Sequence, residues 1–391
     1  MHFRFGLETP TSPNRNPIHP MLGNAPPFQL IETTDQLEAF FEPLSHDGIL
    51  SLDTEFARDR SYYPVLCLLQ IATKRGIVLI DALAIPSHDT ITQALTSTHQ
   101  IKLLHSGRQD IEALNLSCGS LPQRIHDTQI AAAICGFGDQ VGYGRLVFEI
   151  LGIELEKGHT RTDWTQRPLK LEQLHYAAED VAFLEAIYEV LLRQLEKDAR
   201  LPWLEEECSY LLQPHLYSAD VFALWRKISI AQDLSGSQLY RLKHLAAWRE
   251  INAQLMNLPR SWIARDEWLC EIASRPNLPL DTLGQHKFIS AKNRSELIES
   301  LRTTLMQLDE EPGDEAQPIE WSYRPDTKRK DLLKRLSGLV RTESEQLNIP
   351  PSLLASKKDL ENLIDNPEKS RITQGWRATV IGRRLKNELG L

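Results

Sequence analysis

Five residues in the first half of the chain have side-chain types and spacings that suit divalent-metal chemistry: Asp53, Glu55, Asp110, Tyr176 and Asp180. Asp53 and Glu55 occupy positions i and i+2 of an apolar segment, so on a strand both carboxylates project from one face. Asp110 falls in the first turn of a predicted helix, and Tyr176 and Asp180 are four residues apart, so on a helix they share a face.

Each of these motifs taken singly has an ordinary structural explanation. The acid pair fits a solvated strand end, Asp110 fits an acid favoured at a helix start, and Tyr176 with Asp180 fits core packing plus a hydrogen bond. Four carboxylates brought together repel one another unless cations neutralise them. Oxygen ligands favour Mg²⁺ or Mn²⁺, and two such ions roughly 3.5–4 Å apart can serve a phosphoryl displacement. Together the residues therefore predict a two-metal site.

These residues need a sheet with helices to bring them to one place. Short apolar runs at 48–56, 65–73, 76–82, 101–107 and 124–128 predict strands. Helical patterns follow at 108–116 and 129–135, and a long amphipathic helix is predicted over 170–196. Strands mixed with crossover helices indicate an α/β fold with a central sheet covered on both faces.

The strand pattern ends near Pro214, which divides the chain. We expect an irregular extension at 1–27, a sheet domain at 28–213, a helical domain at 214–307, an acidic linker at 308–323 and a second helical domain at 324–391.

Composition restricts the class of protein. The chain has 391 residues, 41% hydrophobic and 25% charged, which is typical of globular domains. No apolar run is long enough to cross a membrane, and the first twenty residues lack the apolar core of a secretory signal. The five cysteines are widely spaced, which favours reduced thiols and a cytoplasmic protein.

Charge is distributed unevenly along the chain. The net charge is −9, but residues 324–391 contain 15 Lys or Arg against 9 Asp or Glu, an excess of +6 that leaves −15 on the first 323 residues. Taken alone, such a basic module fits a solvated face, but its attachment to a domain with a site for phosphoryl displacement favours phosphate contact. We therefore expect this module to attract nucleic acid.

Several segments, in order, resemble the ribonuclease D family of the DEDD exonuclease superfamily: DTEFARDRSYYPVLCLLQIA, HSGRQDIEAL, RIHDT, RTDWTQRPL and YAAEDVAFL. The resemblance covers about residues 28–200, and RTDWTQRPL (161–169) is its most specific part. Residues 240–276 are similar to the helicase-and-RNase-D C-terminal (HRDC) domain, and the second helical module is a looser match. The resemblance implies a ribonuclease H-like mixed sheet followed by two small all-α HRDC-like domains.

The resemblance also implies an activity. Asp53, Glu55, Asp110 and Asp180 match the four metal-binding acids, and Tyr176 matches the tyrosine that orients the attacking water. The implied reaction is 3′→5′ hydrolysis of RNA to nucleoside 5′-monophosphates with two Mg²⁺ or Mn²⁺ ions. Precursors of tRNA and other structured small RNAs are the implied substrates. No obligate protein partner and no membrane association are implied.

Three alternatives stay open. A sister branch of the superfamily uses a histidine five residues before the last acid, where His175 stands, although helix geometry favours Tyr176. A DNA 3′–5′ exonuclease of the same fold is a second alternative. The third is an inactive RNA-binding scaffold, against which the presence of all four acids and the tyrosine argues.

Other polar and aromatic residues receive structural interpretations. Phe56, Tyr62 and Tyr63 suit base stacking and core packing equally well. For Asp163, Trp164 and Arg167 we expect a salt bridge and a packed indole. Asp127 is predicted to cap a helix, and His105 to be a hydrogen-bonded core histidine. An acidic side chain such as that of Asp127 is preferred at a helix N-cap, where it accepts hydrogen bonds from free backbone N–H groups.

Overall fold

A computed structural model describes residues 26–42, 48–155, 162–234, 236–275, 294–310 and 327–391. The predicted N-terminal extension lies outside these ranges except for its last two residues. The predicted acidic linker lies outside them beyond Glu310, and its first three residues belong to a helix instead.

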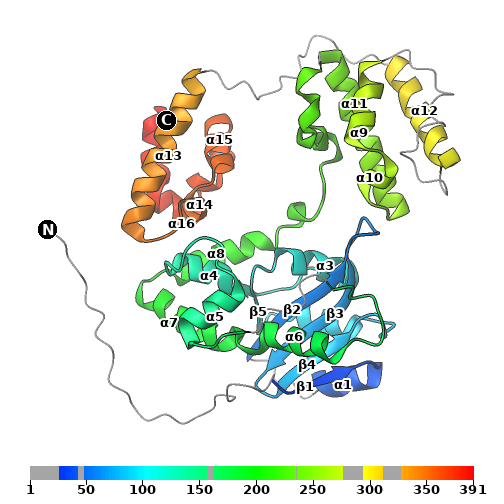
Figure 1. Cartoon of the computed structure of the whole chain (residues 1–391). Coiled ribbons are helices and arrows are strands. Elements are labelled where there is room, and N and C mark those ends of the chain that lie inside the picture. The colour runs from blue at the N-terminus through cyan, green and yellow to red at the C-terminus, as the bar shows by residue number, and fades with distance from the viewer. Residues whose placement is uncertain (1–25, 43–47, 156–161, 235, 276–293, 311–326) are drawn as a thin grey trace.

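A six-stranded mixed sheet forms the first half of the structure (Figure 1). The strands are β1 (Phe28–Ile31), β2 (Gly48–Ala57), β3 (Val65–Thr73), β4 (Gly76–Asp81), β5 (Gln100–Leu104) and β6 (Ile125–Asp127), in the order β1-β4-β3-β2-β5-β6. β3 runs antiparallel to β2 and β4, and the other pairs are parallel. All strands except β1 were predicted from the sequence.

Helices cover both faces of the sheet. They are α1 (Thr34–Phe41), α2 (Asp89–Thr96), α3 (Arg108–Cys118), α4 (Thr128–Ile134), α5 (Tyr143–Leu151), α6 (Leu171–Ala182), α7 (Leu184–Lys197) and α8 (Leu201–Leu211). Leu52 of β2 packs in the largest apolar core with Leu37, Ile91 and Leu114 of α1, α2 and α3. On the opposite face Leu68 and Leu79 pack against Ala177 and Ala178 of α6. The expected α/β architecture is confirmed.

The single long helix predicted over 170–196 is wrong, because Phe183 interrupts it between α6 and α7. The Tyr143 hydroxyl accepts a hydrogen bond from the Phe183 N–H at 3.0 Å and donates to the Glu179 carbonyl at 3.0 Å. The hydroxyl thus replaces a backbone bond between residues i and i−4, which is one of the known causes of a break in a helix.

The rest of the described chain is helical. One bundle contains the 3₁₀ segments Val221–Lys227 and Ser229–Asp233, and the helices α9 (Gly236–Met256), α10 (Arg260–Ile263), α11 (Asp266–Ser274) and α12 (Arg294–Glu310). The other contains α13 (Thr327–Leu347), α14 (Pro351–Leu354), α15 (Lys357–Asp365), α16 (Gly375–Arg377) and α17 (Arg383–Leu389). We call them the first and second helical modules. Each has its own apolar core, and Figure 1 shows both on the same side of the sheet domain.

Two further expectations concern the whole chain. All five cysteines are free thiols, as their spacing predicted. Among the helices that the structure describes, none combines the length and the apolarity that crossing a membrane requires.

Candidate active site

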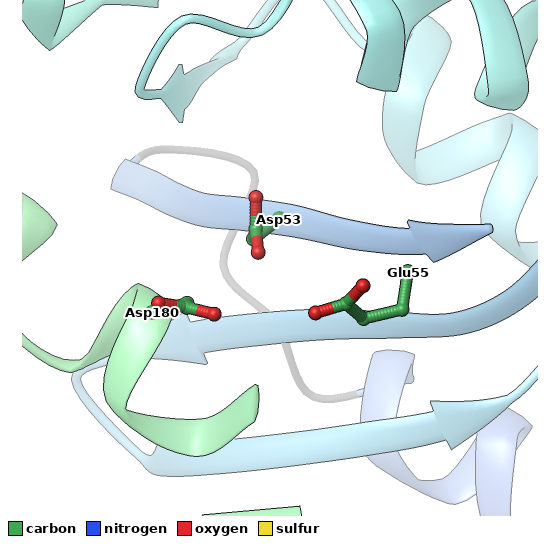
Figure 2. Close-up of side chains that lie close together, drawn as sticks. All are labelled: Asp53, Glu55 and Asp180. Carbon is green, nitrogen blue, oxygen red and sulfur yellow. The ribbon is translucent and has the colours of Figure 1, made fainter. Parts of the chain in front are cut away.

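Three of the predicted acids converge on one face of the sheet. Asp53 and Glu55 of β2 and Asp180 near the end of α6 offer carboxylate oxygens that lie within 4.8 Å of one another. Figure 2 shows these carboxylates directed into the space between the strand and the helix. The ladder between β2 and β3 shifts register between Glu55 and Phe56, so an irregularity follows directly after the second acid.

Asp110 lies beside this cluster, in the first turn of α3, and is held by a different partner. The Thr54 hydroxyl donates to Asp110 Oδ1 at 2.5 Å. The turn before α3 is fixed by Asp127, whose carboxylate accepts hydrogen bonds from the N–H groups of Ser106 (3.1 Å) and Gly107 (2.8 Å). A Cβ at Gly107 would lie 2.7 Å from that of Leu104, so this close turn requires glycine. The structure thus places Asp110 at the site but outside the set of three.

Burial raises the pKa values of all four acids, and neighbouring carboxylates of the site add to the effect at Asp53, Glu55 and Asp180. Burial raises the pKa of Asp53 well above its ordinary value, and Asp110, Asp180 and Glu55 add to the effect. Burial, with Asp180 and Asp110, raises the pKa of Glu55 to about 8. Burial raises the pKa of Asp180 to about 7, although a hydrogen bond from Tyr176 opposes it. Burial also raises the pKa of Asp110 to about 6, against the Thr54 hydrogen bond. Electrostatic repulsion therefore links all four groups.

The donor set fits hard divalent cations. All of these side chains offer carboxylate oxygens, the ligands that Mg²⁺ and Mn²⁺ prefer, and no thiol or imidazole belongs to the set of three. A cation among them would offset both the burial of charge and the mutual repulsion.

Tyr176 rather than His175 belongs to this site. Tyr176 hydrogen-bonds Asp180, and burial together with the carboxylates of Asp180, Glu55 and Asp53 raises the pKa of its phenol. His175 is half-buried and packs edge-on against Phe28 of β1, with ring centroids 5.3 Å apart. β1 is separated from β2 by two strands, so His175 lies toward the β1 edge of the sheet, away from Asp53 and Glu55.

The RTDWTQRPL segment has a structural role from Thr162 onward, and Arg161 lies outside the described residues. Trp164 is buried beside Tyr176, with ring centroids 6.4 Å apart, which confirms the expected packed indole. Arg167 forms its salt bridge with Asp81 of β4, with Nη2 2.7 Å from Oδ1, so the pairing expected with Asp163 is wrong. Asp163 instead accepts a hydrogen bond from the Thr165 N–H at 3.0 Å.

Two other structural interpretations are confirmed. Asp127 caps α4 by accepting from the Gln129 N–H at 2.8 Å. His105 contacts Thr128 Oγ1 and the Val141 carbonyl, each at 2.9 Å, and is thus a hydrogen-bonded core histidine.

Sequence reasoning missed Thr54 and Tyr143. Thr54 binds Asp110, and Tyr143 ends α6 three residues beyond Asp180. The position of Thr54 between the two acids of β2 could have suggested a role at the site. Strand alternation, however, directs its side chain to the face opposite those acids, which argued against that role. No sequence signal links Tyr143 to Phe183.

Tyr62, in the loop between β2 and β3, inserts into the core of the first helical module. Its hydroxyl donates to Glu250, which Arg260 also binds at 2.7 Å. Asn257 Oδ1 accepts from the backbone N–H groups of Tyr62 (3.1 Å) and Tyr63 (3.0 Å). For Tyr62, core packing is therefore the correct interpretation, while Phe56 and Tyr63 stay partly exposed.

Comparison with known proteins gives consistent results. A family model described as a 3′-5′ exonuclease matches residues 28–196. A ribonuclease D of Granulibacter bethesdensis is 36% identical over 90% of this chain and 90% of its own length. A ribonuclease D of Xanthomonas oryzae is 37% identical over 90% of this chain and 94% of its own. The crystal structure of Escherichia coli RNase D, described as an exoribonuclease involved in structured RNA processing, superposes with a TM-score of 0.82 at 30% identity, covering 93% of this chain and 99% of that one.

Proposed function

This chain belongs to the ribonuclease D family, and from that premise we propose that it shortens RNA from the 3′ end, releasing nucleoside 5′-monophosphates with the help of two divalent cations. The observation that carries the proposal is the convergence of Asp53, Glu55 and Asp180 from a strand and a helix distant in sequence. Asp110 beside them completes the acid set. The cations are Mg²⁺ or Mn²⁺.

The acids and the tyrosine have different roles in the proposed reaction. Asp53, Glu55, Asp110 and Asp180 would hold the cations, which supply activation of an attacking water and neutralisation of charge on the departing 3′ oxygen. Tyr176 keeps its proton at neutral pH because its pKa is raised, so it acts as a neutral hydrogen-bonding group that orients water rather than as a base. Trp164 packs beside the phenol and limits its movement.

The helical modules are proposed to be two HRDC-like domains that help to bind RNA, with boundaries at 214–307 and 324–391. The second module carries the excess positive charge, and its Lys330 and Lys334 are exposed one turn apart on α13. Phosphate contact there would offset the repulsion between RNA and the acidic sheet domain. Precursors of tRNA and other structured small RNAs are the proposed substrates, acted on in the cytoplasm.

Nuclease assays test the proposal. The full chain is incubated with a 5′-labelled, 3′-tailed RNA or the DNA of the same sequence, with Mg²⁺, Mn²⁺ or EDTA. We expect stepwise shortening of the RNA that EDTA abolishes, with nucleoside 5′-monophosphates as products. Preferential shortening of the DNA would favour the DNA exonuclease. An RNA left intact under all conditions would favour the inactive scaffold.

A further inference from the structure

Gln70, in the middle of β3, is a buried amide that hydrogen-bonds to no described residue. Its side chain is 0% exposed, and neither its Oε1 nor its Nε2 has a hydrogen-bond partner. A buried amide without a partner destabilises a fold, because water satisfied it in the unfolded chain. Such a group in a native protein calls for a specific explanation.

The location of Gln70 indicates which side chain its amide supports. Gln70 lies directly opposite Asp53 in the antiparallel ladder of β2 and β3, so both side chains project from the same face, with Cβ atoms about 4.5–5.5 Å apart. Its neighbour on the other side is Leu79 of β4, and Leu68 precedes it by two residues on the same face. Both leucines belong to the apolar cluster under α6. Of the two residues directly opposite Gln70 in its ladders, Asp53 is the polar one.

A second unpartnered polar group flanks Asp53 along its own strand. Ser51 lies two residues before Asp53 and therefore faces the same way. The residue is 1% exposed, and its hydroxyl has no hydrogen-bond partner among the described residues. Asp53 is thus bordered by a buried amide across the ladder and a buried hydroxyl along it.

We propose that Gln70, assisted by Ser51, is a positioning residue for Asp53, to which its Nε2 donates a hydrogen bond when divalent cations occupy the site. The inference rests on the proposed function, because it assigns the support of one of the proposed metal ligands. A carboxylate has about four lone-pair sites, so the oxygen positions that face the sheet remain free for a donor when cations take those facing Glu55 and Asp180.

The chemistry of an amide suits this role. A lysine or arginine at position 70 would place a positive charge beside Asp53 and compete with the cations for it. A neutral amide fixes the orientation of the carboxylate without that competition. Groups that support metal ligands in this way typically change metal affinity about 10–100-fold when they are replaced.

Binding of Mn²⁺ to the full-length protein without RNA, followed by electron paramagnetic resonance, tests the inference. The variant Gln70→Met keeps an unbranched side chain of similar length but removes both polar atoms. We expect its affinity for Mn²⁺ to fall about 10–100-fold. Its melting temperature in EDTA should stay equal to the wild type or rise, because an unpartnered buried amide has been removed. An amide that only fills space would give the same melting result with unchanged affinity, and that outcome would overturn the inference.

A serine pair provides the matched control. Ser51→Ala and Ser344→Ala each remove a buried hydroxyl that has no partner, but Ser344 lies on α13 in the second helical module. We expect Ser51→Ala to weaken Mn²⁺ binding and Ser344→Ala to leave it unchanged. Equal affinities for the two variants would contradict the inference, and this comparison also serves if Gln70→Met does not fold.

The same titrations separate this inference from the function on which it rests. A wild-type protein that binds no Mn²⁺, like an Asp53→Asn variant used as the reference for an empty site, would contradict the proposed function itself. A wild type that binds Mn²⁺ with the affinity of Gln70→Met would contradict only the role given to Gln70.

Discussion

We predict that Glu207→Gln loosens the second helical module from the sheet domain. Glu207 lies on α8, is 7% exposed, and binds three groups of the module. Its carboxylate accepts from Arg371 Nη2 at 2.6 Å, from Trp376 Nε1 at 2.9 Å, and from Arg377 Nη1. The side chain of Arg377 is 2% exposed, so its charge depends on this carboxylate.

The magnitude follows from the burial of Arg377. Removing one partner of a buried ion pair typically costs about 3–5 kcal/mol, because the other charge is left uncompensated. Glutamine still offers an oxygen to the Trp376 indole, so we expect a loss of docking free energy at the lower end of this range, about 3 kcal/mol. Since about 1.4 kcal/mol corresponds to a factor of ten, the opening equilibrium of the module should rise about 100-fold.

Hydrogen exchange measured by mass spectrometry reports this opening. Backbone amides of α16 and α17 should exchange about 100-fold faster in Glu207→Gln. The control is Glu206→Gln, one residue away. Glu206 Oε2 accepts from the Trp376 N–H at 2.9 Å, and a glutamine oxygen can do the same. Equal exchange in the two variants would refute the assignment of the docking energy to Glu207.

The pH dependence gives an independent check. Burial raises the pKa of Glu207, but hydrogen bonds and charges from Arg377 and Arg371 outweigh it, so the pKa lies below the ordinary value of 4.5. A carboxyl group whose pKa is lowered by folding stabilises the folded state at pH values above its pKa in the unfolded chain. This contribution is lost as the pH falls through the pKa of the group in the folded state. Protection of α16 should therefore decline below pH 4.5 in the wild type, and the part of that decline due to Glu207 should be absent from Glu207→Gln.

Three other predictions follow from the site and the modules. Asp53→Asn should abolish RNA shortening and raise the melting temperature in EDTA, because it removes one charge from a repelling set; wild-type turnover would count against the site. Tyr62→Ala should weaken docking of the first module by about 3–5 kcal/mol, seen as faster proteolysis around α9, because it empties an aromatic site in that core; unchanged proteolysis would argue otherwise. Lys330→Glu with Lys334→Glu should weaken RNA binding and reduce its salt dependence by about one unit of slope per lost phosphate contact, measured by filter binding at several salt concentrations; an unaltered slope would exclude these lysines from the contact.

The elements that carry the candidate site residues, and the faces on which these residues lie, were predictable because they follow local periodicities. Alternation along β2 puts Asp53 and Glu55 on one face, and four-residue spacing puts Tyr176 and Asp180 on one face of α6. The strand before Asp110 is followed by Ser106 and Gly107, a turn pair that marks the start of α3. None of these inferences required knowledge of contacts between distant segments.

The placement of Asp110 outside the set of three and the end of α6 at Phe183 were not predictable, because distant hydrogen bonds decide them. Thr54 binds Asp110 across 56 positions of the chain, and Tyr143 ends α6 by binding Phe183 across 40. Tyr62 enters a core formed almost two hundred residues later. Periodicity describes an element's own faces, and it contains no information about which side chain from elsewhere meets them.

Most arginines in the described part of the second module are already paired with acids, so they do not supply free positive charge. In the second module Arg329, Arg335, Arg341 and Arg384 form ion pairs with Asp365, Glu388, Glu345 and Glu343. Arg371 and Arg377 bind Glu207 of the sheet domain. The planar guanidinium suits such paired contacts, whereas a lysine ammonium acts as a compact point charge. Exposed Lys330, Lys334, Lys358 and Arg383 form no ion pair with another described residue, so lysines supply most of the charge that would be offered to phosphate. Contacts of lysines with phosphates carry no sequence information, which would suit the proposed exonuclease, because it would act on the backbone at a 3′ end rather than on a sequence motif.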